Sequence, residues 1–166
     1  MPDYTVLPYN RELAVSYARR WAYGRNPAFY DFSEIGGDCT NFASQCIYAG
    51  AGIMNFTPTY GWFYRSAQIR TASWTGVEYL YNFLVTNEGA GPFAKVVPLS
   101  EIQRGDIVQL GRETGDFYHS PVVVRVTADG EILVAAHSYD VYGKSLLSYN
   151  APVMRGLHIL GARKPT

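Results

Sequence analysis

Residues 36–46 read Gly-Gly-Asp-Cys-Thr-Asn-Phe-Ala-Ser-Gln-Cys, and the rest of the chain is best understood outward from this stretch. Apolar side chains recur at helical spacing from Cys39 onward, and Asp38 is a good N-cap residue for a helix that begins there. The glycine pair before Asp38 lets the backbone turn into the helix. We therefore predict a helix over residues 39–49, with a cysteine in its first turn.

The predicted position of Cys39 suits a nucleophile. The first turn of a helix carries unpaired backbone N–H groups and the positive end of the helix dipole, and both favour a thiolate. Cys46 falls in the middle of the same helix on its apolar stripe, which is typical of a buried structural thiol. On this helix the two Cα atoms would lie roughly 10 Å apart, beyond the limit of about 7 Å for a disulfide.

The chain changes character near residue 90. Helical periodicity predicts two further helices, over residues 10–23 with Asn10 as N-cap and over residues 75–86 with Thr75 and Glu78 in capping-box spacing. After residue 90 the runs shorten, and strands are expected over residues 96–97, 106–110, 120–126, 131–137 and 157–162. Helices followed by antiparallel strands predict an α+β fold, in one domain that spans residues 1–166.

A cysteine nucleophile requires a base, and His119 is the candidate. It opens the predicted strand over residues 120–126, where a side chain at the rim of a sheet can face a cleft. His137 and Asp140 compete for the role of the residue that orients it. A three-residue loop over 127–129 would pair Arg125 with Glu131 and His119 with His137.

A two-residue turn at Asp129-Gly130 would instead set Asp140 opposite His119. The opposite charges of Arg125 and Glu131 favour the first register, so His137 is preferred and Asp140 is the alternative. His158 lies in an alternating strand pattern and is interpreted as structural.

Composition narrows the function classes. The 166 residues carry 14 Lys plus Arg and 14 Asp plus Glu, and this balance does not favour a nucleic-acid partner. No apolar run approaches the roughly 20 residues of a membrane span. The N-terminus has no basic and apolar segments of a secretion signal, although the chain would fit the mature part of a longer secreted protein. The spacing of cysteine and histidine fits no zinc site, so no metal or other cofactor is expected.

The stretch Gly37-Asp38-Cys39-Thr40-Asn41-Phe42-Ala43-Ser44-Gln45-Cys46 resembles the signature of the putative amidase domain family. Further matches follow in that family's order: Ser73-Trp74-Thr75, Gly105-Asp106-Ile107-Val108, His119-Ser120, Ala136-His137-Ser138 and Ser145-Leu146-Leu147. The family is related to NlpC-type cell-wall peptidases and CHAP amidases. The resemblance implies a papain-like α+β fold with N-terminal helices packed on a C-terminal antiparallel sheet.

The resemblance also implies a cysteine-dependent amide hydrolase. Cys39 would be the nucleophile, His119 the base and His137 the orienting residue, and the substrate an amide such as the stem peptide of bacterial peptidoglycan. Around the oxyanion and the substrate we place Asp38, Tyr30 and Trp62, with Tyr60 and Tyr64 as further groove candidates; Trp74 is also considered there, but core packing is its preferred role. Two alternatives are acyl transfer on the same residues and a catalytically silent binding module. A role at the cell wall would place the protein outside the cell; the oligomeric state is not written in the sequence.

Overall fold

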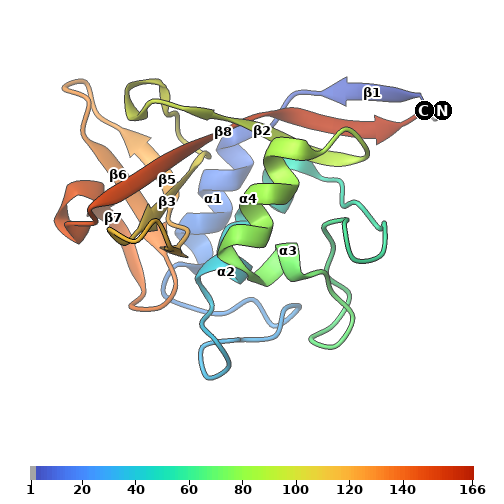
Figure 1. The fold of residues 1–166 in the computed structure, drawn as a ribbon, viewed down its shortest axis with the longest axis horizontal. Coiled ribbons are helices and arrows are strands. Elements are labelled where there is room, and N and C mark those ends of the chain that lie inside the picture. The colour runs from blue at the N-terminus through green and yellow to red at the C-terminus, as the bar shows by residue number, and fades with distance from the viewer. Residues whose placement is uncertain (1–2) are drawn as a thin grey trace.

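The computed structural model describes residues 3–166 and confirms the α+β class (Figure 1). The helices in this range are α1 (Arg11–Trp21), α2 (Cys39–Ala51), the short α3 (Ala72–Thr75) and α4 (Val77–Thr86). The strands are β1 (Tyr4–Leu7), β2 (Gly91–Val97), β3 (Ile107–Gly111), β4 (Phe117–His119), β5 (Val122–Val126), β6 (Ile132–Ala136), β7 (Val141–Ser145) and β8 (Val153–Pro165). Two 3-10 helices connect strands: η1 (Leu99–Glu101) lies between β2 and β3, and η2 (Leu146–Tyr149) lies between β7 and β8.

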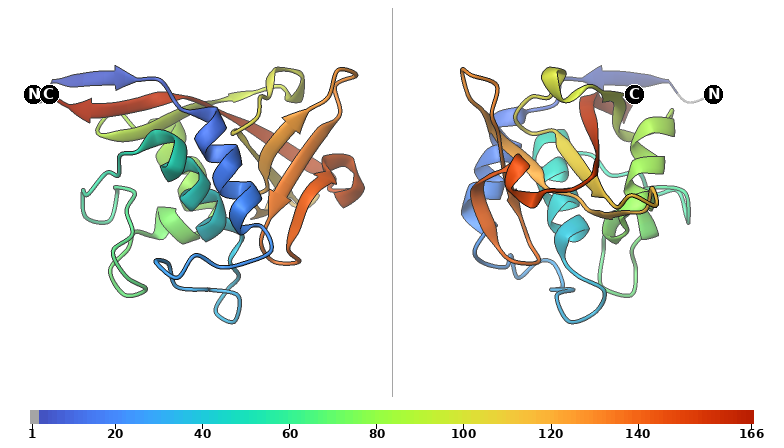
Figure 2. Two further views of the ribbon diagram at one scale, coloured as in Figure 1. Left: turned by 180° about the vertical axis from the view of Figure 1, so that it is seen from behind. Right: turned by 60° about the vertical axis from the view of Figure 1, so that its left-hand side comes forward.

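One antiparallel sheet runs in the order β1-β8-β3-β5-β6-β7, with β2 pairing β8 and β4 pairing β3. The 13-residue β8 organises the sheet, because its first half pairs with β3 and its second half lies between β1 and β2. The end of β8 and β1 project together from the body of the molecule, where Tyr4 pairs with Pro165 (Figures 1 and 2).

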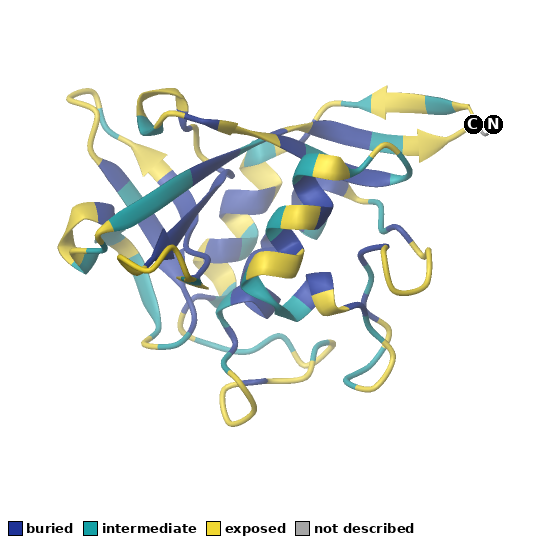
Figure 3. Ribbon diagram, in the orientation of Figure 1, coloured by how far each residue is buried: buried dark blue, intermediate teal, exposed yellow. Residues whose placement is uncertain are grey.

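Helix α2 lies at the centre of the molecule rather than on its surface. The structure buries ten of its thirteen residues, and α1 packs alongside it (Figures 2 and 3). The predicted apolar stripe is buried, but burial extends beyond it to polar residues of α2. Asn41 and Ser44 are buried because they bond the indole N–H groups of Trp74 and Trp62, and Ser44 also donates to the Trp74 carbonyl. The polar residues of α2 therefore fix the aromatic core instead of facing water.

The helices predicted from periodicity are present, with corrections at their ends. Asn10 caps α1 by accepting a hydrogen bond from the Leu13 amide, as expected, although Leu13 itself is exposed. The third predicted helix is interrupted at Gly76, which is the N-cap of α4, so the capping box at Thr75 was wrong. The Thr75 hydroxyl instead accepts a hydrogen bond from Arg70.

The strands are confirmed in the second half of the chain, whereas β1, β7 and most of β2 were missed. β1 and β7 pair at the edges of the sheet and contain no buried residue, so they lack the pattern by which buried strands are recognised. None of the helices within residues 3–166 has the length and apolar character needed to span a membrane.

Candidate active site

The turn before α2 determines where the Cys39 thiol lies. Gly36 and Gly37 have φ values of +82° and +98°, a region that favours glycine, and they carry the chain into Asp38. Asp38 is the N-cap residue by position, and Cys39 is the first residue of α2, both as predicted. The structure leaves the thiol partly exposed and keeps Cys46 fully buried with no disulfide between them.

The side chain of Asp38 does not cap the helix in the expected way. One carboxylate oxygen accepts hydrogen bonds from the Phe32 amide at 2.8 Å and from Asn41 Nδ2 at 2.9 Å. The other oxygen contacts Nδ1 of His137. Asp38 is fully buried and is absent from the pocket that Cys39 lines, so the assignment of its side chain to substrate or oxyanion contact was wrong. It holds the turn beneath the nucleophile instead.

His137 is bound to this carboxylate rather than to His119. Its Nε2 lies 2.8 Å from the Trp21 carbonyl oxygen, and its ring stacks on Phe42 with centroids 4.1 Å apart. The side chain is therefore held between α1, α2 and the end of β6. The other candidate for orienting the base, Asp140, forms a two-point ion pair with Arg25 at 3.0 and 3.1 Å.

The register argument that favoured His137 was wrong. Val126 pairs with Ile132, so the loop spans residues 127–131 and not 127–129, and Arg125 pairs with Leu133, where the sequence predicted Glu131. In addition, β4 leaves the path of β5 and pairs with β3, so that His119 faces Leu110. A longer loop shifts every pair of the hairpin, which charge matching at one position does not reveal.

His119 lies at the edge of the same pocket as Cys39. The two residues are 80 positions apart in sequence, and both line a pocket of about 460 Å³. The imidazole is 7% exposed, and burial lowers its pKa to about 4. No described residue from 3 to 166 forms a hydrogen bond with its ring nitrogens, and its nearest aromatic neighbours are Tyr149 and Tyr118.

Burial also acts on the thiol. It raises the pKa of Cys39, and this effect outweighs the backbone amides of Thr40 and Ser120 and the Thr40 hydroxyl, which favour the thiolate. Because the pKa of His119 is lowered and that of Cys39 is raised, both groups are neutral at rest: the thiol is protonated and the imidazole is not. The effect of the helix start, which was expected to favour a thiolate, is therefore outweighed at rest, because the low dielectric of the pocket penalises charge.

Residues that the sequence did not single out complete the pocket. Burial, assisted by the nearby Cys39 sulfur, raises the pKa of Tyr149 to about 12, so its hydroxyl stays a hydrogen-bond donor at neutral pH. Below Cys39, the hydroxyls of Thr40 and Ser120 lie 3.3 Å apart, and Gln109 donates to Ser120. Thr40 and Ser120, which directly follow the candidate nucleophile and the candidate base, carried a positional signal, whereas Tyr149 is brought in by η2.

The aromatic residues expected around the substrate lie elsewhere. Trp62 is fully buried and donates its indole N–H to Ser44, so it is a core residue, as Trp74 is. Tyr30 is 45% exposed and packs edge-on against Phe32, outside the pocket beside Cys39. Tyr60 and Tyr64 are also outside it. The two tryptophans therefore contribute to the hydrophobic core and not to a substrate groove.

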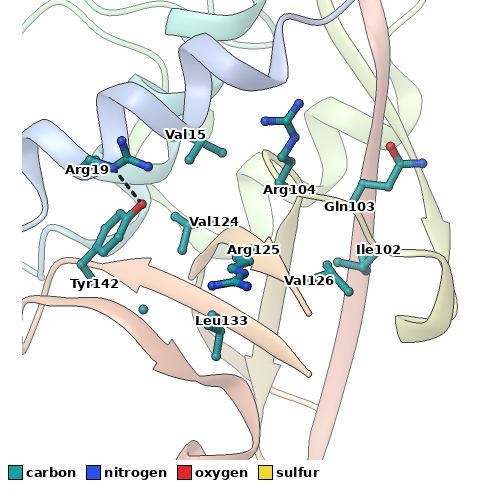
Figure 4. A pocket seen from close by; sticks show the side chains of 11 residues that line it. Val15, Arg19, Ile102, Gln103, Arg104, Val124, Arg125, Val126, Leu133 and Tyr142 are labelled. Atoms are coloured by element: carbon teal, nitrogen blue, oxygen red, sulfur yellow. Dashed lines mark hydrogen bonds between the residues drawn. The ribbon is translucent and has the colours of Figure 1, made fainter. Parts of the chain in front are cut away.

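A larger cavity of about 730 Å³ lies between α1 and the β5–β7 part of the sheet (Figure 4). Arg19, Arg104 and Arg125 reach it from three different elements, and Arg19 donates to the Tyr142 hydroxyl there. Its lining includes no cysteine, histidine or carboxylate. Since it contains no nucleophile or base, the smaller pocket beside Cys39 is the candidate active site. Within residues 3–166, no group of three or more His, Cys, Asp and Glu side chains has the arrangement of a metal site.

The chain matches a known protein family and a curated relative. A family model described as "Putative amidase domain" matches residues 8–159. The chain is also similar to "Uncharacterized protein YhbB" of Bacillus subtilis (strain 168), with 33% identity over 138 residues, which are 81% of this chain and 43% of that relative. The chain thus spans less than half the length of this curated relative. No solved structure matches it.

Proposed function

The chain belongs to the putative amidase domain family, and from this premise we propose that it is a cysteine hydrolase that cleaves amide bonds through a thioester. One observation carries the proposal: Cys39 at the start of α2 and His119 on β4 line one pocket. A cysteine at a helix N-terminus and a histidine on an antiparallel sheet that line one pocket also support a papain-like fold, in the line of the NlpC-type and CHAP enzymes.

The first step follows from the neutral resting pair. The Cys39 sulfur forms a bond to the amide carbon while its proton passes to the neutral His119 imidazole, which acts as general base. The carbonyl π electrons move to oxygen. The oxyanion is stabilised by the unpaired backbone N–H groups at the start of α2 and by the Tyr149 hydroxyl, which takes the place proposed from sequence for Tyr30.

The second half of the cycle uses the same two residues. His119 gives its proton to the leaving nitrogen as the C–N bond breaks, and an amine departs. A water molecule then attacks the thioester while His119 accepts its proton, and the Cys39 thiol is regenerated with release of the carboxylic acid. His137 and Asp38 act as positioning residues, because their buried contact holds the turn that carries Cys39.

A direct test compares Cys39→Ala with the matched variant Cys46→Ala. Peptide-containing bacterial cell-wall material is the first substrate, and newly released amines are measured. We expect Cys39→Ala to lose activity by about a thousandfold or more, whereas Cys46→Ala retains it once folding is confirmed. Mass spectrometry of wild-type protein quenched during turnover should find the acyl group on Cys39.

Two results would contradict parts of this proposal. Amide hydrolysis that survives in Cys39→Ala removes the cysteine mechanism. An absence of new amines from peptidoglycan, with hydrolysis of other peptide amides retained, removes the cell-wall substrate alone.

A further inference from the structure

Lys144 is the one charged side chain, apart from the candidate base, that lines the pocket beside Cys39 in the described structure. The other polar groups there are uncharged hydroxyls, chiefly those of Tyr118, Tyr139 and Tyr149. Building on the proposed hydrolase function, we propose that this pocket selects amide substrates that carry a carboxylate near the cleaved bond, and that Lys144 binds this carboxylate. Nothing in the catalytic step described above uses Lys144.

A bulge in β7 places Lys144 on this side of the sheet. Ala135 pairs with Tyr142 and Val134 pairs with Lys144, so Gly143 is an extra residue, and its φ is +76°. Without it, Tyr142 and Lys144 would share a face. With it, Tyr142 faces α1 and accepts a hydrogen bond from Arg19, whereas Lys144 lies with Tyr149 in the Cys39 pocket.

The positive charge of Lys144 is not neutralised within the protein. Its ammonium lies 4.6 Å from the centre of the Tyr149 ring, a cation–π contact, and it has no ion pair with a described carboxylate. The acids nearest in sequence to the pocket residues are already occupied, since Asp38 contacts His137 and Asp140 pairs with Arg25. The three ammonium hydrogens therefore remain available to an incoming anion.

Peptide-like amides carry their negative charge as carboxylates, which matches a half-buried ammonium at the wall of an otherwise neutral pocket. A neutral pocket of about 460 Å³ with one cation distinguishes substrates by charge more sharply than an exposed surface does, because its aromatic walls limit solvent screening.

The experiment uses two alkylating reagents of similar size, anionic iodoacetate and neutral iodoacetamide, on the Cys46→Ala protein. Both modify any accessible thiolate at about pH 8.5, so the ratio of their rates at Cys39 measures local charge whether or not the protein hydrolyses amides. We expect Lys144→Gln to lower the iodoacetate-to-iodoacetamide ratio by roughly threefold to tenfold at low salt, and added salt to reduce the difference. Lys144→Glu should lower it further.

Lys95→Gln is the matched control, because it removes an equal charge from an exposed lysine on β2 outside the pocket. Its ratio should equal that of the parent protein. If Lys144 merely supports Tyr149, its removal changes both rates by the same factor and leaves the ratio unchanged, and that result overturns the proposal. If Lys144→Gln lowers the iodoacetate-to-iodoacetamide ratio but the wild-type protein hydrolyses no amide, the proposed enzyme function is contradicted and the charge effect of Lys144 is not.

A substrate pair completes the test. Peptides with Glu or Gln beside the cleaved bond differ by one charge, and we expect the preference for Glu in kcat/KM to fall on Lys144→Gln and to persist in Lys95→Gln. Equal use of the two peptides by the wild-type protein would also overturn the proposal.

Discussion

At the scale of single residues, the properties of Cys39 and His119 come from burial rather than from their immediate neighbours. Burial raises the pKa of the thiol and lowers that of the imidazole to about 4. Under the proposed mechanism, the proton is therefore transferred as the substrate is attacked, and His119 remains unprotonated well below neutral pH. This resembles a neutral general-base system more than a preformed ion pair.

The lowered pKa of His119 also predicts a pH dependence of stability. Its pKa falls from 6.5 to about 4 on folding, so the unfolded chain binds the proton more tightly between these values. The stabilisation is complete above about pH 6.5 and is lost as the pH falls toward 4, by about 3 kcal/mol in all. Urea unfolding of wild type and His119→Gln across this range should show the loss in wild type and a smaller slope in the variant; equal slopes would contradict it.

Asp38 gives a second residue-scale prediction. Its buried carboxylate accepts from Phe32 and Asn41 and contacts His137. Asp38→Asn removes the charge and turns an amide donor toward existing donors, so we expect a loss of about 2–4 kcal/mol in the free energy of unfolding. Activity per folded molecule should fall as well, because the turn below Cys39 is disturbed.

The exposed Asp129 provides the comparison for this variant. Its carboxylate contacts only its own hairpin turn, so Asp129→Asn should change both stability and activity little. Full activity in folded Asp38→Asn protein would show that this carboxylate does not position the nucleophile.

At the scale of elements, α2 shows how packing overrides helix propensity. Gly50 lies in its last turn, and a Cβ there would come 2.4 Å from the Tyr9 ring and 2.7 Å from the Asn10 carbonyl oxygen. The Asn10 amide also donates a hydrogen bond to the Gly50 carbonyl at 2.9 Å, which holds the two backbone segments together. This glycine lets the chain that enters α1 pack directly against the end of α2.

We accordingly expect Gly50→Ala to destabilise the protein by about 2–4 kcal/mol despite the higher helix propensity of alanine. Thermal unfolding measures this. Gly24→Ala is the control, since a Cβ at Gly24 meets only Trp21 at 3.8 Å and should alter the melting temperature little. A neutral or stabilising Gly50→Ala would show that α1 and α2 move apart easily.

At the scale of the whole molecule, Asp106 joins helix and sheet far from the pocket. It is fully buried, and its two oxygens receive hydrogen bonds from Arg11 on α1 and from the Ile159 amide on β8, and contact His158. His158 thus has the structural role predicted for it. This carboxylate ties the first helix to the strand that organises the sheet.

Asp106→Asn therefore separates global stability from the chemistry at Cys39. Breaking a buried ion pair leaves Arg11 uncompensated, and we expect a loss of about 3–5 kcal/mol in unfolding free energy. The folded fraction should nevertheless retain its rate of Cys39 alkylation, in contrast to Asp38→Asn. A changed alkylation rate under folding conditions would link the two networks.

Local patterns in the sequence determined the α+β class, α1 and α2, the central strands and the position of Cys39 at the start of its helix, and they singled out His119 as the candidate base. These features depend on side-chain periodicity, capping residues and turn residues, which act over a few positions. The exposed edge strands and the break at Gly76 lack such strong local patterns, which is why they were missed.

The tertiary structure alone decided which residues surround the thiol. The pairing of β4 with β3 takes His119 out of the predicted register with His137, and the bulge in β7 places Lys144 in the pocket. Burial of the aromatic residues removed Trp62 from the site, and η2 brought Tyr149 into it. Strand register and burial result from the packing of the whole chain, so they cannot be predicted from the residues next to a position in the sequence.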